Sequence, residues 1–143
     1  MTQVIELTKI TFKKIEAEWF NYFNTKREIA LIREEIMNPF QEKVDENIGG
    51  SRSNEVGRPT ERIATRLSLN KQLNHLQDIV EAIDQVYEAL PEEYQKLVKL
   101  RYWSKNRQLT WDGIALELNI SKRQAMRWRD EIIQATSEVL GWR

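Results

Sequence analysis

Seven apolar residues in the middle of the chain recur at alternating steps of four and three positions. Three uninterrupted heptads of this kind are typical of a helix that packs against another helix along a narrow apolar seam. The pattern therefore predicts a helix from about Thr60 to Ala89. The seam residues are Leu69, Leu73, Leu76, Val80, Ile83, Tyr87 and Leu90.

A second amphipathic pattern lies between Thr8 and Met37, where apolar residues follow steps of three and four. It predicts one long helix that ends at Asn38, because a residue before proline is pushed out of the helical region. The two helices have similar lengths, so we expect an antiparallel hairpin with residues 40–59 as a long loop. Two interpretations stay open: the helices bury each other's apolar stripes, or the surplus apolar surface also mediates self-association.

The region after Leu90 begins with a different pattern. Pro91, followed by Glu92 and Glu93, is typical of a first helical turn, since proline lacks only an N–H that would be unpaired there and acids favour the positive end of the helix dipole. We expect this helix to run to about Trp103.

Two further helices are expected after a polar turn. Thr110 is the expected N-cap of a helix at Trp111–Leu118, and Ser121 the expected N-cap of a helix that starts near Lys122. Asn119 should adopt the left-handed conformation in the turn between them, because Asn tolerates it better than any residue except Gly. The last helix should end at Leu140, before Gly141.

These elements predict an all-α protein, with a long antiparallel helical hairpin followed by a C-terminal three-helix helix-turn-helix domain. The expected boundary lies at the Leu90–Pro91 step. Residues 1–90 would form the hairpin, the candidate oligomerisation region, and residues 91–143 the helix-turn-helix domain.

Charge is distributed unevenly along the chain, although its 22 basic and 22 acidic residues cancel. Lys99–Arg129 holds eight Lys or Arg residues against two Asp or Glu residues. Gln72–Gln95 has six acids and no Lys or Arg. The basic block indicates an anionic partner. The net charge of the whole chain hides this local excess of positive charge.

The last helix combines an apolar face with a basic one. Ala125, Trp128, Ile132 and Ile133 have core spacing, while basic and polar residues fall on the other side. Arg and Lys can donate to guanine and Gln can pair with adenine, so double-stranded DNA is the predicted partner. The candidate DNA-binding residues are Lys122, Arg123, Gln124, Met126, Arg127 and Arg129. The candidate phosphate contacts are Lys105, Arg107, Thr110 and Ser121. The simpler interpretation is that these arginines only solvate a helix face.

The segment Leu90–Ala135 resembles the region 4 helix-turn-helix of bacterial sigma factors in its LPEE opening, its LRY ending of the first helix and its IAxxLxIS core. The whole chain, including REEIMNPF and the DENIGG stretch at Asp45–Gly50, is similar to RinA-type phage transcriptional activators. This resemblance implies a phage or prophage activator of late or packaging genes. One recognition helix offers few base contacts, so specificity requires a dimeric site or a second DNA-bound partner such as RNA polymerase. A promoter-melting region has no room in 143 residues, which favours an accessory regulator. The resemblance implies sigma-like contacts at Lys122, Arg123, Gln124, Met126 and Arg127.

Other function classes find less support in the sequence. His75 is the one histidine, there is no cysteine, and no phosphate-binding GK[ST] motif occurs, so we expect no enzyme, catalytic residue, metal ion or cofactor. No apolar run is long enough to span a membrane and the start lacks a signal peptide, so a cytoplasmic protein is expected. The alternatives that stay open are a packaging adaptor similar to a small terminase subunit and a coiled-coil interaction protein.

Two surface hypotheses concern the hairpin. Its tip is basic and would touch phosphate or a partner, or would be only a solvated loop. Its second helix has acids on one face. This face is either a docking surface for RNA polymerase or an ordinary solvated surface. The basic residues are Arg52, Arg58, Arg62, Arg66 and Lys71, and the acids are Asp78, Glu81, Asp84 and Glu88.

Overall fold

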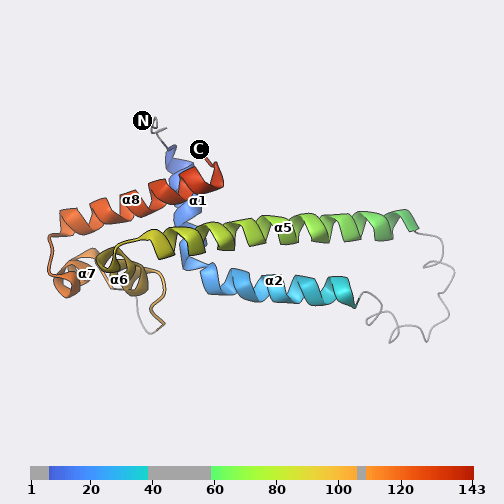
Figure 1. Cartoon of the computed structure of the whole chain (residues 1–143), viewed down its shortest axis with the longest axis horizontal. Coiled ribbons are helices and arrows are strands. Elements are labelled where there is room, and N and C mark those ends of the chain that lie inside the picture. Colours follow the sequence, from blue (N-terminus) through green and yellow to red (C-terminus); the bar gives the residue numbers. More distant parts are fainter. Residues whose placement is uncertain (1–6, 39–58, 106–108) are drawn as a thin grey trace. The chain divides into compact units, whose positions relative to one another are not determined.

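The computed structural model of the chain describes residues 7–38, 59–105 and 109–143. These residues form six helices and no strand, which confirms the all-α class (Figure 1). The predicted loop at 40–59, apart from Pro59, and the DENIGG stretch lie outside the described residues. The helices are α1 (Lys9–Phe20), α2 (Tyr22–Met37), α5 (Pro59–Ala89), α6 (Glu92–Arg101), α7 (Trp111–Leu118) and α8 (Lys122–Leu140).

The prediction of a single helix from Thr8 to Met37 is wrong, because the helix is divided at Asn21. Asn21 has φ −90° and ψ 5°, and its N–H donates to the carbonyl oxygen of Ala17 at 2.9 Å. The indole Nε1 of Trp103 donates to the carbonyl oxygen of Trp19 at 3.2 Å, close to the break. Trp103 also stacks on Tyr22, with 4.9 Å between ring centroids. The break is therefore stabilised by a distant aromatic residue.

The chain divides into two compact units. The first unit comprises residues 1–23 and 79–143, and thus contains α1, the end of α5 and the helices α6 to α8. The second unit comprises residues 24–78. Helix α1 therefore shares a compact unit with the three C-terminal helices, although the sequence pattern groups it with the hairpin.

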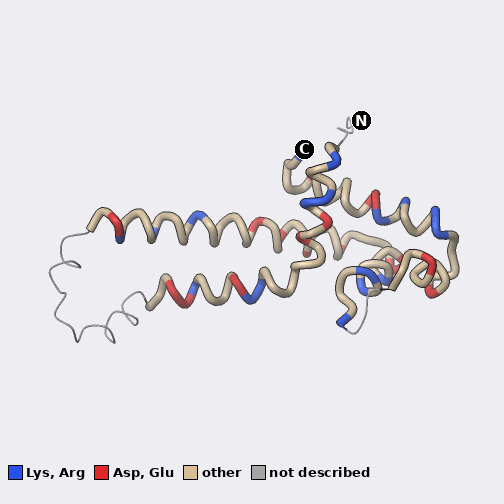
Figure 2. The backbone as a smooth tube through the Cα atoms, turned by 180° about the vertical axis from the view of Figure 1, so that it is seen from behind, with Lys and Arg blue, Asp and Glu red and all other residues tan. Residues whose placement is uncertain are grey.

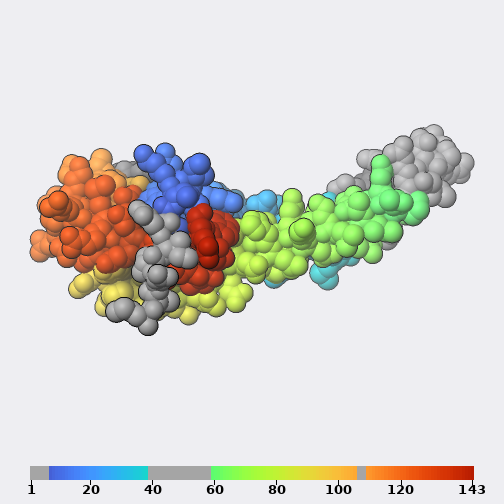
Figure 3. All heavy atoms as spheres, turned by 90° about the horizontal axis from the view of Figure 1, so that it is seen from above, coloured from blue at the N-terminus to red at the C-terminus, as the bar shows by residue number. Residues whose placement is uncertain are grey.

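The core of the first unit joins α1 to α8. Atoms of α1 lie against atoms of α8 in the space-filling view (Figure 3). Trp19 and Thr136 are both fully buried, and Trp19 Nε1 donates to Thr136 Oγ1 at 3.1 Å. The Thr136 hydroxyl in turn donates to the carbonyl oxygen of Ile132 at 2.7 Å. The polar atoms of this contact are thus paired inside an apolar core, as burial requires.

The local signals that separate the C-terminal helices are confirmed. The side-chain oxygens of Thr110 and Ser121 each accept a hydrogen bond from the backbone N–H three residues later, both at 3.1 Å. Asn119 has φ 62° and ψ 40°, the predicted left-handed conformation. Gly141 ends α8 with φ 77°. Helices α7 and α8 therefore have the predicted bounds, while α6 is shorter than expected and ends at Arg101.

The second unit contains residues of α2 and α5. Some of their apolar side chains are buried and others are exposed. Ile29 and Ile32 of α2 are buried. The heptad residues Leu69, Leu73 and Leu76 of α5 are only half-buried. Among the described residues of this unit, four large apolar side chains are exposed, namely Leu31, Met37, Ile63 and Leu67.

Candidate nucleic-acid interface

The first two turns of α8 present one face to solvent and the other to the core. Ala125 and Trp128 are buried. The residues that the sequence assigned to DNA lie mainly on the opposite side: four are exposed and Met126 is half-buried. Basic positions gather toward the start of α8 (Figure 2). The exposed candidates are Lys122, Arg123, Gln124 and Arg127.

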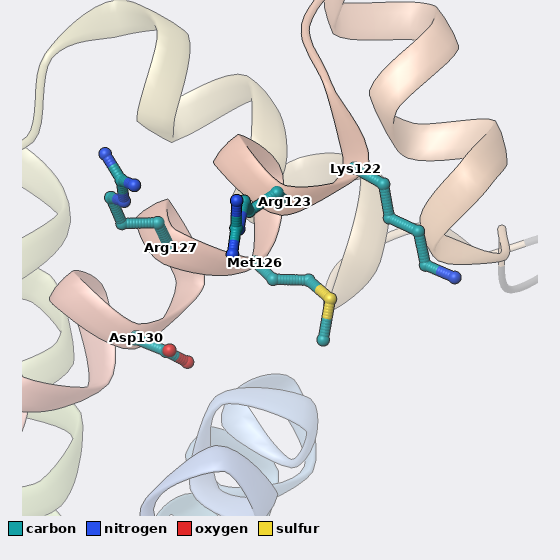
Figure 4. A pocket seen from close by; sticks show the side chains of 5 residues that line it. All are labelled: Lys122, Arg123, Met126, Arg127 and Asp130. Atoms are coloured by element: carbon teal, nitrogen blue, oxygen red, sulfur yellow. The ribbon is translucent and has the colours of Figure 1, made fainter.

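An open hollow of about 550 Å³ lies along this face of α8. It is lined by Lys122, Arg123, Met126, Arg127 and Asp130, all from the first three turns of α8. Lys122 and Met126 extend to the same side in the close-up, whereas Arg127 extends to the other (Figure 4). The face thus offers separated cationic groups around one apolar side chain.

Lys122 has one acidic neighbour in the first turn of α7. Its Nζ lies 4.0 Å from Oδ1 of Asp112, and both side chains are well exposed. An exposed pair at this distance contributes little free energy, because water and salt screen it. The ammonium group of Lys122 can therefore exchange this partner for a phosphate.

Arg129 differs from the other candidates, because only 14% of its side chain is exposed. Its Nε donates to Oδ1 of Asp130 at 2.6 Å, and its Nη1 lies 3.5 Å from Oε2 of Glu16. The guanidinium also lies 5.0 Å from the ring centroids of both Phe12 and Trp111. The structure thus separates Arg129 from the exposed cations.

Glu16 of α1 is a member of this region that sequence reasoning missed. Its Oε2 accepts from the Tyr102 hydroxyl at 2.8 Å and from Arg101 Nε at 3.3 Å, and it pairs with Arg129. Burial, followed by the neighbouring Glu16 carboxylate, raises the pKa of Tyr102 well above its ordinary value. The two arginines lie 85 and 113 positions along the chain from Glu16, so no local pattern could reveal the cluster.

The candidate phosphate contacts are placed in different ways. Thr110 and Ser121 are exposed at the starts of α7 and α8, and each uses a hydroxyl lone pair as an N-cap acceptor. The hydroxyl proton can still be donated to a phosphate oxygen. Lys105 is exposed, and Arg107 lies outside the described residues.

The base of the α8 face is held by an aromatic pair. The rings of Tyr94 and Trp128 stack with centroids 4.6 Å apart and planes 16° apart. The Tyr94 hydroxyl donates to Glu131 on α8. Burial and this hydrogen bond raise the pKa of Tyr94 to about 12. Helix α6 thereby fixes α8 at two points.

The surface residues of the two hairpin hypotheses differ in their environments. Asp84 is half-buried and accepts a hydrogen bond from the Tyr22 hydroxyl, whereas Glu81 and Glu88 are exposed. Arg62, Arg66 and Lys71 are exposed on α5, while Arg52 and Arg58 lie outside the described residues.

Metal ions and membranes are the other partners to consider for the part of the chain that the structure describes. There, no group of three or more His, Cys, Asp or Glu residues could hold a metal ion. His75 is exposed on α5. Likewise, no helix among the described ranges is long and apolar enough to cross a membrane.

Comparison with known proteins identifies relatives. The chain is similar to the transcriptional activator rinA of Staphylococcus phage phi11, with 25% identity over 131 residues, which cover 92% of this chain and 91% of that protein. No solved structure matches the chain. The model of the family described as "Protein of unknown function (DUF722)" matches residues 12–138. Because this match covers most of the chain, the protein belongs to that family.

Proposed function

We propose that this protein is a DNA-binding transcriptional regulator of a phage or prophage, in which α7 and α8 act as a helix-turn-helix. The observation that carries the proposal is the exposed face of α8, where Lys122, Arg123, Gln124 and Arg127 surround Met126. The opposite face of the same turns is anchored in the core by Ala125 and Trp128. A rigid helix with this division of side chains suits the major groove of double-stranded DNA.

The side chains on this face have distinct roles in the proposal. Arg123 and Arg127 donate to guanine O6 and N7, Gln124 pairs with adenine, and Met126 makes apolar contact with a thymine methyl group. Lys122 contacts phosphate after leaving Asp112.

The starts of the two helices would complete the proposed contact with the duplex. The hydroxyls of Thr110 and Ser121 would donate to phosphate oxygens, in the positive field of the helix N-termini. Lys105 would add a further phosphate contact.

The similarity to a phage transcriptional activator supports activation as the outcome of binding. The resemblance of residues 90–135 to sigma factor region 4 makes RNA polymerase the second proposed partner. The proposed targets are the promoters of late or packaging genes. Asp78, Glu81 and Glu88, which are exposed on α5, are the acids of the predicted docking surface available for that contact.

We also propose that the protein acts as a homo-oligomer. One recognition helix makes few base contacts, so a specific site requires either two copies or a second DNA-bound partner. The exposed apolar residues of the second unit, among them Ile63 and Leu67 of α5, support self-association.

The experiment that tests DNA binding compares Arg123→Ala and Arg127→Ala with the parent on its genomic site, located first by sequencing the DNA bound in cells. Each lost base contact should weaken specific binding by about 1–3 kcal/mol. The free energy of unfolding should change by no more than about 0.5 kcal/mol, because both side chains are exposed.

Arg33→Ala is the matched control for this experiment, since it removes an exposed arginine from α2 in the other unit. It should leave specific affinity unchanged. Parental affinity in both α8 variants would overturn the proposed interface.

A further inference from the structure

Two arginines next to the proposed recognition face are neutralised inside the protein. Glu16 of α1 pairs with Arg101 of α6 at 3.3 Å and with Arg129 of α8 at 3.5 Å, and only 15% of its side chain is exposed. Asp130 adds a second carboxylate at 2.6 Å from Arg129. Glu16, Asp130 and the two guanidinium groups thus have formal charges that cancel.

Aromatic rings hold both guanidinium groups in this arrangement. The Arg101 and Arg129 guanidinium carbons lie 4.3 and 5.0 Å from the ring centroid of Trp111. Arg129 lies above Phe12 of α1 as well. Cation–π contacts and the shared carboxylate therefore restrain two cations that could otherwise extend to solvent.

The sequence position of Arg129 makes this restraint relevant to DNA. It follows the exposed Arg127 by two residues and precedes Asp130, which lines the open hollow on α8. Sequence-independent affinity for a duplex rises with the number of phosphates that a protein neutralises. Specificity is the ratio of specific to non-specific affinity. A mobile cation that finds a phosphate on any duplex, but is not aligned with one when α8 is held in register on its specific site, raises the non-specific affinity more and lowers that ratio.

Building on the proposed DNA binding, we infer that Glu16 is a specificity-determining positioning residue: it withholds Arg101 and Arg129 from the phosphate backbone. Among the described candidate residues of this region, the cations offered to DNA are then those on the exposed face of α8, together with Lys105. Helix α1 thereby takes part in DNA recognition, through a carboxylate that touches no nucleotide.

Glu16→Gln in the full chain tests the inference, because it removes the charge and keeps the size and an acceptor for Tyr102. Binding to the genomic site and to a duplex of scrambled sequence is measured over a series of salt concentrations. The slope of log K against log salt for the scrambled duplex should steepen by up to about 0.9 for each guanidinium released. The ratio of specific to non-specific affinity should fall.

Two further variants attribute the effect. In the double variant Glu16→Gln, Arg129→Ala, the salt slope for the scrambled duplex should be shallower than in Glu16→Gln alone. The difference is the contribution of the released Arg129. Glu34→Gln removes one exposed carboxylate from α2 in the other unit, and should leave the slope at the parental value. An unchanged slope in Glu16→Gln, or an equal change in Glu34→Gln, would overturn the inference.

Arg129→Ala alone decides the matter if Glu16→Gln does not fold. A withheld arginine predicts an unchanged salt slope, whereas a phosphate contact predicts a slope shallower by about 0.9. A shallower slope in Arg129→Ala would overturn this inference. The proposed function would still stand if Arg123→Ala weakened specific binding. A parent that binds neither duplex would overturn both.

Discussion

Trp128 and Arg127 are adjacent in sequence and have opposite environments. Trp128 is 8% exposed and stacks on Tyr94, while Arg127 is exposed beside the hollow on α8. One side chain therefore supports the helix and the other is available for contact. The difference follows from the rotation of about 100° between consecutive helical residues.

Trp128→Ala should lower the free energy of unfolding by about 3–5 kcal/mol, since it removes a large buried aromatic side chain. Thermal denaturation followed by circular dichroism measures the effect. Arg127→Ala is the control on the neighbouring residue and should shift stability by no more than about 0.5 kcal/mol. Equal stability of the two variants would contradict the division into core and contact residues.

At the scale of the element, the turn between α7 and α8 depends on Asn119. Among the described residues, Asn119 is the one non-glycine residue with positive φ, at 62°. The N–H of Ile120 donates to the carbonyl oxygen of Ala115 at 3.0 Å, so the chain reverses within a few residues. The direction in which α8 leaves α7 is set by this conformation.

Asn119→Ala should lower the free energy of unfolding by about 1 kcal/mol, because alanine keeps the Cβ that crowds the following carbonyl oxygen in the left-handed conformation but lacks the short polar side chain with which Asn bonds to the nearby backbone. Asn119→Gly has no Cβ and should cost less. Denaturant unfolding of the two variants makes the comparison. If alanine were tolerated as well as glycine, backbone conformation would not be what this position requires.

At the scale of the whole molecule, α1 is part of the first compact unit and packs on α8. Ile15 of α1 is fully buried in the same cluster as Ile132 and Ile133 of α8. Residues from opposite ends of the chain therefore form one core. We expect α1 and α8 to unfold together as one cooperative unit.

Ile15→Ala should lower the stability of this unit by about 2–5 kcal/mol and speed hydrogen exchange at the α8 amides, although the change is in α1. Ile10→Ala is the matched control, because Ile10 lies on the same helix and is 81% exposed. It should have little effect on either quantity. Unaltered exchange in α8 of the Ile15 variant would show that α1 is not part of a shared cooperative unit.

Sequence by itself determined the features that depend on residues close together in the chain. The caps at Thr110 and Ser121, the left-handed Asn119 and the bounds of α7 and α8 were all predictable. So was the apolar face of α8 that contains Trp128. Their causes are backbone hydrogen bonds and helical periodicity, which act over about four residues.

Tertiary structure alone decided the features that depend on distant partners. The helix broke at Asn21, where Trp103 packs beside the break. Arg129 was drawn from the expected DNA face into a cluster with Glu16, 113 positions away. Local periodicity treats such an arginine as one more exposed cation, because the carboxylate that neutralises it becomes a neighbour only when α1 packs on α8.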